Sequence, residues 1–153
     1  MRLTEILKPQ SIVAPLQATD KTAAITELVN LLASNGEITD SEKVLSAILE
    51  RESTRTTGIG NGLAIPHGKT HGVKQLVIAI GRPAQGIDFA SIDGKPVNLI
   101  WLLASPPDKT GPHITALGKI SRLMIIDTFR TKLQTAENAS AMYDLIVKQE
   151  ESM

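Results

Sequence analysis

Apolar residues recur at helical spacing in two segments of the first third of the chain. The first segment follows Asp20 and is stopped by Gly36, and its apolar positions are Ala24, Ile25, Leu28, Val29 and Leu32. This spacing predicts a helix with one buried face. The second segment opens with Thr39-Asp40-Ser41-Glu42, which is typical of a capping box. Its predicted buried face consists of Val44, Leu45, Ile48 and Leu49.

The middle of the chain has shorter apolar runs that predict strands. Residues 76–80 predict one strand, and residues 97–103 predict a second that is buried on both faces. Residues 86–89 and 93–96 contain the glycines, aspartates and proline of a strand edge and a turn. We therefore expect a small sheet built from the centre of the sequence.

The carboxyl-terminal third returns to helical spacing. Pro112 suits a first helical position, and the apolar stripe that follows is predicted at Ile114, Leu117, Ser121 and Met124. Asp127 and Asn138 are predicted to cap two further helices. The order of helices, strands and helices predicts one α/β domain over residues 1–153, with a mostly central sheet.

Composition narrows the class of protein. Hydrophobic residues are 42% and charged residues 21% of the 153, as in an ordinary globular domain. Sixteen basic and sixteen acidic residues give zero formal net charge, which does not favour non-specific binding to nucleic acid. There is no cysteine, so disulfides, thiolate nucleophiles and cysteine zinc sites are excluded. We expect a cytoplasmic protein without membrane insertion, because the sequence shows no span and no signal-peptide core.

The candidate chemistry lies between Thr57 and Thr70. Glycines alternate at positions 58, 60 and 62, and such a backbone can closely approach a ligand or a partner. Leu63 and Ile65 are predicted to face the core on a short extended piece. His67 then follows Pro66, and we expect it to project from a rigid, exposed turn.

Several familiar motifs fit this segment poorly. A phosphate-binding P-loop needs one residue fewer before its lysine, and Pro66 removes an amide from the cradle. The glycines lack the strand and helix that flank a dinucleotide fingerprint. His67 and His71 have the spacing of metal ligands on a helix, but the surrounding glycines and Pro66 disfavour a helix. A serine hydrolase elbow is absent. We expect neither a metal nor a cofactor.

The remaining interpretation of this segment is a histidine that acts as a nucleophile. Imidazole titrates near ~6.5, so a neutral nitrogen is available to attack a phosphoryl group at physiological pH. The phosphate oxygens then need cations or amides around them, for which Arg51, Lys69 and His113 are candidates. The predicted helix start at His113 would favour an anion and keep this imidazole neutral. The residues alone leave other roles open: His113 could simply start a helix, and Arg51 could be a solvated surface charge.

The segment from Gly58 to Lys69 closely resembles the active-site motif of the enzyme IIA domains of the sugar phosphotransferase system, fructose/mannitol type. Nitrogen-regulatory IIA proteins share this motif. Further matches in the same order are Arg51-Glu52, residues 86–89, residues 93–97, and His113 with Leu117 and Ser121-Arg122-Leu123. The resemblance extends over roughly residues 3–147.

The resemblance implies a site and a fold. It implies that His67 is phosphorylated, on Nε2, that His113 is the second active-site histidine, and that Arg51 is the pocket arginine. The implied fold is α/β, a mixed β-sheet with α-helices on both sides. We add Lys69 and Gly68 as phosphate-binding positions because they adjoin His67 in sequence.

The implied partners are a histidine phosphocarrier protein as donor and a cysteine of an enzyme IIB domain as acceptor. The first functional hypothesis is a phosphocarrier for fructose/mannitol-type sugar uptake. The alternative is a nitrogen-regulatory IIA-like protein, in which the phosphorylation state of His67 controls binding to regulatory targets. A hydrolase or metal-dependent enzyme is a third hypothesis. The sequence does not indicate which sugar is transported, or which oligomer forms.

Overall fold

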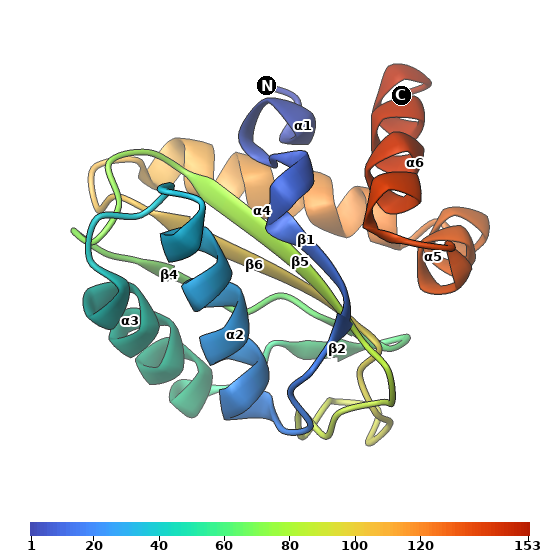
Figure 1. Cartoon of the computed structure of the whole chain (residues 1–153), viewed down its shortest axis with the longest axis horizontal. Helices are drawn as coiled ribbons and strands as arrows, with labels where there is room; N and C mark the ends of the chain where they lie inside the picture. Colours follow the sequence, from blue (N-terminus) through green and yellow to red (C-terminus); the bar gives the residue numbers. More distant parts are fainter.

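The computed structural model describes all residues from 1 to 153 and shows a mixed sheet with helices on both faces (Figure 1). The predicted fold class is therefore confirmed. The elements in chain order are α1 (Leu3–Ile6), the 3₁₀ helix η1 (Pro9–Ser11), β1 (Ile12–Leu16), α2 (Lys21–Ser34), α3 (Ser41–Thr54), β2 (Gly58–Gly60), β3 (Leu63–Ala64), β4 (His67–Lys69), β5 (Val77–Pro83), β6 (Leu99–Ser105), α4 (Thr110–Met124), α5 (Asp127–Thr135) and α6 (Ala139–Glu151). None of these helices has both the length and the apolar character needed to cross a bilayer.

The sheet has the order β1-β5-β6-β3-β2, and β4 also pairs with β6. β1 runs parallel to β5, and β5 runs antiparallel to β6. β3 and β4 both run parallel to β6 on the side away from β5, one after the other along its length. β2 covers the outer side of β3, so β4 remains an uncovered edge strand.

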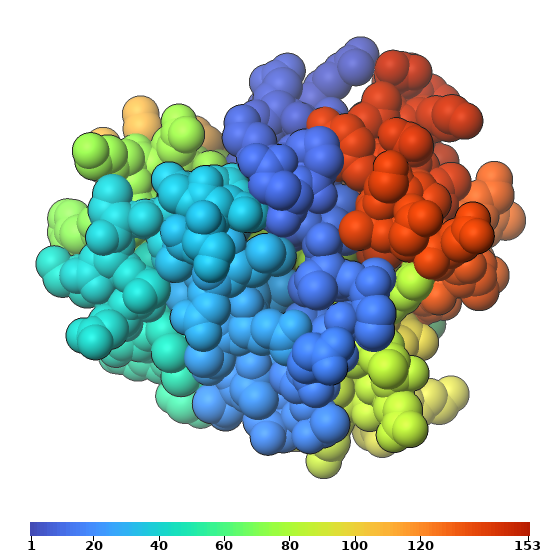
Figure 2. All heavy atoms as spheres, in the orientation of Figure 1, coloured from blue at the N-terminus to red at the C-terminus, as the bar shows by residue number.

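Two hydrophobic cores lie on the two faces of the sheet. Side chains alternate along β6: Ile100, Leu102 and Ala104 join the core under α2 and α3, whereas Leu99 and Trp101 join the core under α1, α4, α5 and α6. Figure 2 shows α2 and α3 packed over the front of the molecule. Every residue of β6 is buried, which confirms the prediction of a strand buried on both faces.

The two predicted amino-terminal helices are confirmed, with one correction to their caps. Asp20 caps α2 by accepting a hydrogen bond from the amide of Ala23. The predicted capping box at Thr39 is wrong, because Asp40 caps α3 instead. The hydroxyl of Thr39 donates to the carbonyl of Gly72 and so joins α3 to the loop that follows β4.

The carboxyl-terminal helices differ more from the predictions. α4 begins at Thr110, so Pro112 is its third residue and not its first. The predicted stripe is right at Met124 but wrong at Ile114 and Ser121, which are exposed. The buried face consists of His113, Ala116, Ile120, Leu123 and Met124. Asn138 caps α6 as predicted. Asp127 does not cap α5 but forms its first residue.

The chain before residue 19 also differs from the prediction, since α1, η1 and β1 lie in a region for which no element was predicted. β1 is short and half-exposed, with Ile12 and Leu16 buried and the residues between them largely open. Five residues with one proline give too little periodicity to identify a strand. Its place in the sheet comes from pairing with β5.

The alternating glycines form a hairpin and do not approach the site. Asn61 and Gly62 both have positive φ, 58° and 76°, as a tight turn between β2 and β3 requires. A Cβ on Gly62 would lie 2.5 Å from Oδ1 of Asn98, and one on Gly58 would collide with Ser91. These glycines are explained by the hairpin and its packing, and none of the three lines the pocket that contains His67.

The structure predicts opposite effects for two glycine-to-alanine substitutions. Gly72→Ala should lower the free energy of unfolding by about 1–3 kcal/mol, because its Cβ would lie 2.7 Å from the backbone oxygen of Asp40. Gly118→Ala, inside α4 and with only the tip of Arg122 nearby, should raise it by about 0.5–1 kcal/mol. Urea unfolding followed by the fluorescence of Trp101, the single tryptophan, measures both. Equal effects of the two substitutions would contradict this packing.

Candidate functional site

A groove of about 530 Å³ lies over the edge strand β4, between α3 on one face of the sheet and α4 on the other. We call it the histidine groove. The residues that line it come from three separate parts of the sequence. They include Glu50, Arg51, His67, Gly68, Lys69 and His113. All five predicted site residues therefore line one groove.

The sheet register explains how the groove is assembled. In the parallel pair of β4 and β6, His67 lies beside Leu103, and Lys69 lies beside Ser105. Leu103 belongs to the core on the α4 side, so strand alternation points His67 toward α4 as well. Gly68 faces the opposite way, where a Cβ would lie 3.3 Å from backbone atoms of α3. Gly68 thus allows α3 to pack closely against the strand that carries His67.

The imidazole of His67 is fixed by a backbone hydrogen bond. Its Nδ1 lies 2.7 Å from the carbonyl oxygen of Ile65. A carbonyl oxygen only accepts, so Nδ1 carries the proton and Nε2 keeps its lone pair. The carbonyl of Ile65 accepts no backbone amide. The amide of Ile65 donates to the carbonyl of Thr57, but the amide of Thr57 donates to Glu52 and does not return the bond. The carbonyl of Ile65 is therefore free to accept from His67.

The prediction that His67 projects from an exposed turn is wrong. His67 begins the short strand β4, and its side chain is half-buried. Burial lowers the pKa of His67 below its ordinary value of 6.5, and the charge of Arg51 lowers it further. The hydrogen bond to Ile65 and the charge of Glu52 act in the opposite direction but do not outweigh these effects. The imidazole is therefore neutral and nucleophilic at pH 7.

His113 stands across the groove from His67, and the centroids of the two rings are 5.6 Å apart. Its Nδ1 lies 2.7 Å from Oγ of the buried Ser105. Burial lowers the pKa of His113 to about 4, and repulsion from His67 when that ring is protonated, and from Lys69, lowers it as well. His113 is neutral, as expected, but burial is the main cause. The predicted free amide at this position is wrong, since the amide of His113 donates to the carbonyl of Lys109.

Two permanent cations complete the groove. Arg51 donates from Nη1 to the carbonyl of Arg55, which leaves its other guanidinium donors for a ligand. Lys69 is exposed, and its Nζ lies 3.4 Å from the hydroxyl of Thr110. Neither cation forms an ion pair within the protein. The groove can therefore receive an anion such as a phosphoryl group.

A buried carboxylate behind the groove was not predicted. Glu52 accepts hydrogen bonds from the amide and hydroxyl of Thr57, and it pairs with Lys21 at 2.9 Å. Burial alone would raise the pKa of Glu52, but the bonds from Thr57 and Lys21 outweigh burial and lower it. Glu52 thereby ties α2 and α3 to the start of β2. A charged residue at a buried position of the α3 stripe was the signal for it.

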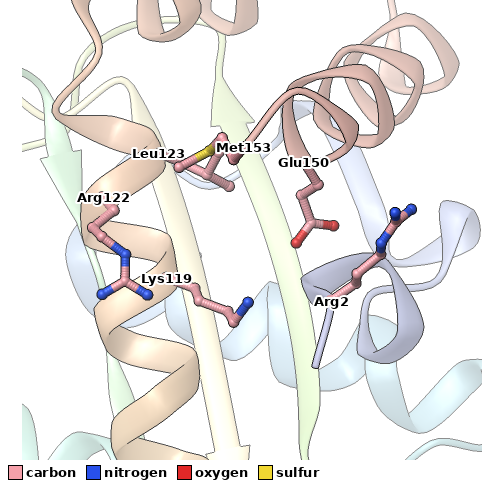
Figure 3. A pocket seen from close by; sticks show the side chains of 6 residues that line it. All are labelled: Arg2, Lys119, Arg122, Leu123, Glu150 and Met153. Atoms are coloured by element: carbon pink, nitrogen blue, oxygen red, sulfur yellow. The ribbon is translucent and has the colours of Figure 1, made fainter.

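Other features lie outside the histidine groove. His71 is exposed and lines a neighbouring hollow with Glu42 and Pro107, so it is separate from the pair of histidines. A further hollow of about 410 Å³ lies between α4 and the chain ends, where Figure 3 shows the side chains of Lys119 and Arg122 from α4 with those of Arg2 and Glu150. No histidine lines it.

The chain matches the model of a known protein family over almost its whole length. The family model described as "Phosphoenolpyruvate-dependent sugar phosphotransferase system, EIIA 2" matches residues 5–149. The chain belongs to this family. The fructose-specific EIIABC component of the phosphotransferase system of Bacillus subtilis is 37% identical over 146 residues. That match covers 95% of this EIIA chain but only 23% of the Bacillus protein.

Solved EIIA structures have the same fold. The crystal structure of the nitrogen regulatory protein IIA-Ntr from Neisseria meningitidis matches with a TM-score of 0.87 and 32% identity, over 94% of this chain and 98% of that one. Enzyme IIA-Mtl from Escherichia coli, in a complex with phosphorylated enzyme IIB-Mtl, matches with a TM-score of 0.79 and 18% identity, over 94% and 99% of the two chains. The second likeness concerns the fold alone.

The lowered pKa of His113 predicts a defined pH dependence of stability. Between pH 6.5 and about 4 the unfolded chain binds a proton at His113 and the folded EIIA chain does not, so folding weakens as the pH falls. Between pH 7 and 4.5, the free energy of unfolding should fall by roughly 1–3 kcal/mol less in His113→Gln than in the wild type. Urea titrations at both pH values measure the difference. Equal slopes in the two proteins would show that His113 titrates normally.

Proposed function

We propose that this chain is a phosphocarrier: His67 accepts a phosphoryl group from a histidine phosphocarrier protein and passes it to a cysteine of an enzyme IIB. The proposal rests on one observation, the hydrogen bond of 2.7 Å from Nδ1 of His67 to the carbonyl of Ile65. This bond leaves Nε2 as the nucleophilic nitrogen. Family membership supports the same role.

The two transfer steps are substitutions at phosphorus. In the first, the lone pair of Nε2 forms a bond to the phosphorus of the donor's phosphohistidine, and the donor's P–N bond breaks with its electron pair returning to the donor imidazole. In the second, a IIB thiolate attacks the same phosphorus, and the P–N bond at His67 breaks. No proton has to leave Nε2, because the neutral ring already holds its proton on Nδ1.

The groove supplies the charge that a bound phosphoryl group needs. The group carries about −1.5 to −2 charges at pH 7 and three acceptor oxygens. Arg51 and Lys69 provide cations from α3 and β4, and neither is neutralised by a carboxylate. The low pKa of His113 keeps this ring neutral, so it can donate one hydrogen bond without a second charge in the groove. We assign Gly68 the role of spacing α3 against β4.

Transport and regulation are both candidate roles for this phosphocarrier. The EIIABC name of the Bacillus relative and the IIA-Mtl complex with phosphorylated IIB-Mtl favour transfer to a IIB domain in fructose/mannitol-type uptake. The match to IIA-Ntr at 32% identity favours the second role, in which phosphorylation of His67 controls binding to regulatory targets. The chemistry at His67 is the same in both.

The phosphocarrier role predicts an acid-labile phosphate on His67. We expect incubation with phosphoenolpyruvate, the general phosphotransferase enzyme and the carrier protein to add one phosphoryl group, detected by intact mass spectrometry. His67→Ala should accept none, because it lacks the nucleophile. His71→Ala is the matched control and should be phosphorylated like the wild type, because His71 lies outside the groove. A wild-type chain that stays unmodified would exclude the proposal.

The choice between the two roles predicts different acceptors. In the transport role, adding a cognate IIB should remove the phosphate from His67 and phosphorylate the IIB cysteine. In the regulatory role, a pull-down should capture different partners with the unphosphorylated protein, the phosphorylated protein and His67→Ala. Phosphate that stays on this chain in the presence of IIB counts against transport, and identical partners in all three samples count against regulation.

A further inference from the structure

Ser105 is the one hydroxyl-bearing residue of the otherwise apolar strand β6, and it is its last residue. The side chain is completely buried. Its Oγ lies 2.7 Å from Nδ1 of His113 and has no other hydrogen-bond partner. The contact joins the end of β6 to the imidazole that faces His67.

Hydrogen-bond accounting decides the direction of this contact. A neutral imidazole has one protonated nitrogen and one acceptor nitrogen, and a serine hydroxyl has a single proton. If Ser105 donates to Nδ1, both the hydroxyl proton and the nitrogen lone pair are satisfied. If Nδ1 donates instead, the hydroxyl proton of Ser105 has no acceptor at a completely buried position. The first arrangement is therefore favoured.

We propose that Ser105 is a positioning residue that holds His113 in the tautomer with its proton on Nε2, ready to donate to a phosphoryl group on His67. This inference rests on the proposed phosphocarrier function. The two ring nitrogens are joined through Cε1 and their in-plane bonding directions diverge widely, so with Nδ1 turned to the buried Oγ, the Nε2–H points away from that hydroxyl. The ring lines the histidine groove, where the phosphoryl oxygens would lie.

The two histidines thereby have opposite tautomers. The carbonyl of Ile65 holds the proton of His67 on Nδ1, which leaves a lone pair on Nε2 for phosphorus. The hydroxyl of Ser105 does the reverse at His113, which puts a donor on its Nε2. With the other tautomer of His113, a lone pair would face the negative oxygens and repel them. The accepting carbonyl of Ile65 thus suits His67 to attack phosphorus. The donating hydroxyl of Ser105 suits His113 to donate a hydrogen bond to the phosphoryl oxygens.

The first test is the tautomer of His113 in the unphosphorylated protein. Proton–nitrogen correlation spectra of the imidazoles at pH 7 should show His113 with its proton on Nε2, and His67 with its proton on Nδ1. Ser105→Ala should convert the His113 signals to those of a mixed tautomer. Ser91→Ala is the control, because Ser91 is another buried serine, has an unpartnered Oγ and should leave the spectra unchanged. A wild-type His113 with its proton on Nδ1 overturns the inference.

The second test is the rate of phosphoryl transfer to and from His67. Ser105→Ala should slow transfer by about three- to tenfold, the range expected from the loss of one hydrogen bond. Ser105→Thr keeps the hydroxyl and should restore both the rate and the tautomer. In a His113→Ala background, Ser105→Ala should have no further effect, because there is no ring to orient. A slowing of the same size in that background would show a general structural effect and overturn the inference.

The outcomes separate this inference from the proposed function. If the wild type accepts phosphate while Ser105→Ala leaves both tautomer and rate unchanged, the role of Ser105 is wrong and the phosphocarrier role stands. If the wild type accepts no phosphate, the phosphocarrier role fails and the role of Ser105 fails with it. The tautomer of His113 is decided by the spectra in either case.

Discussion

The hydrogen bond between Nδ1 of His67 and the carbonyl of Ile65 is the interaction on which the account of this protein depends. It settles which nitrogen holds the proton and therefore which nitrogen is free to attack. It can form because the carbonyl of Ile65 accepts no backbone amide: the amide of Thr57, which could pair with it, donates to Glu52 instead. The ladder to β6 continues past this point, since the carbonyl of Pro66 accepts from the amide of Leu103.

The edge position of β4 turns this local geometry into a site. Because β4 has no neighbour on its outer side, helices from both faces of the sheet come close to it, α3 with Arg51 and α4 with His113. An uncovered edge strand is normally a liability for aggregation. Here its length of three residues and the side chain of Lys69 limit that risk. The opening gives a partner protein access to His67.

Sequence patterns could predict those parts of this site that depend on neighbours along the chain. The motif indicates residues close in sequence, such as His67 and Lys69, and the residue type of Asn138 predicts it as a cap. The sequence does not predict which face of α4 is buried, because Ile114 is apolar but exposed while His113 is polar but buried. Helical periodicity assumes that apolar positions face the core, and a functional surface breaks that assumption.

Contacts between distant segments could not be predicted from the sequence. The bond of Ser105 to His113 and the network of Glu52 with Lys21 depend on strand register and helix packing. A serine or a glutamate within an apolar pattern signals that a partner exists, but it does not say which. Arg51 and His113 are candidates from their residue types and the resemblance implies their roles, and the register of β4 on β6 helps to explain why they meet His67.

The most direct measurement of the central claim is the site of phosphorylation at the level of single atoms. Protein labelled with ¹⁵N at histidine and phosphorylated through the carrier protein would be examined by nitrogen–phosphorus coupling. The account predicts coupling from phosphorus to Nε2 of His67, with the proton of Nδ1 still hydrogen-bonded to Ile65. Coupling to Nδ1 of His67, or to a nitrogen of another histidine, would contradict it.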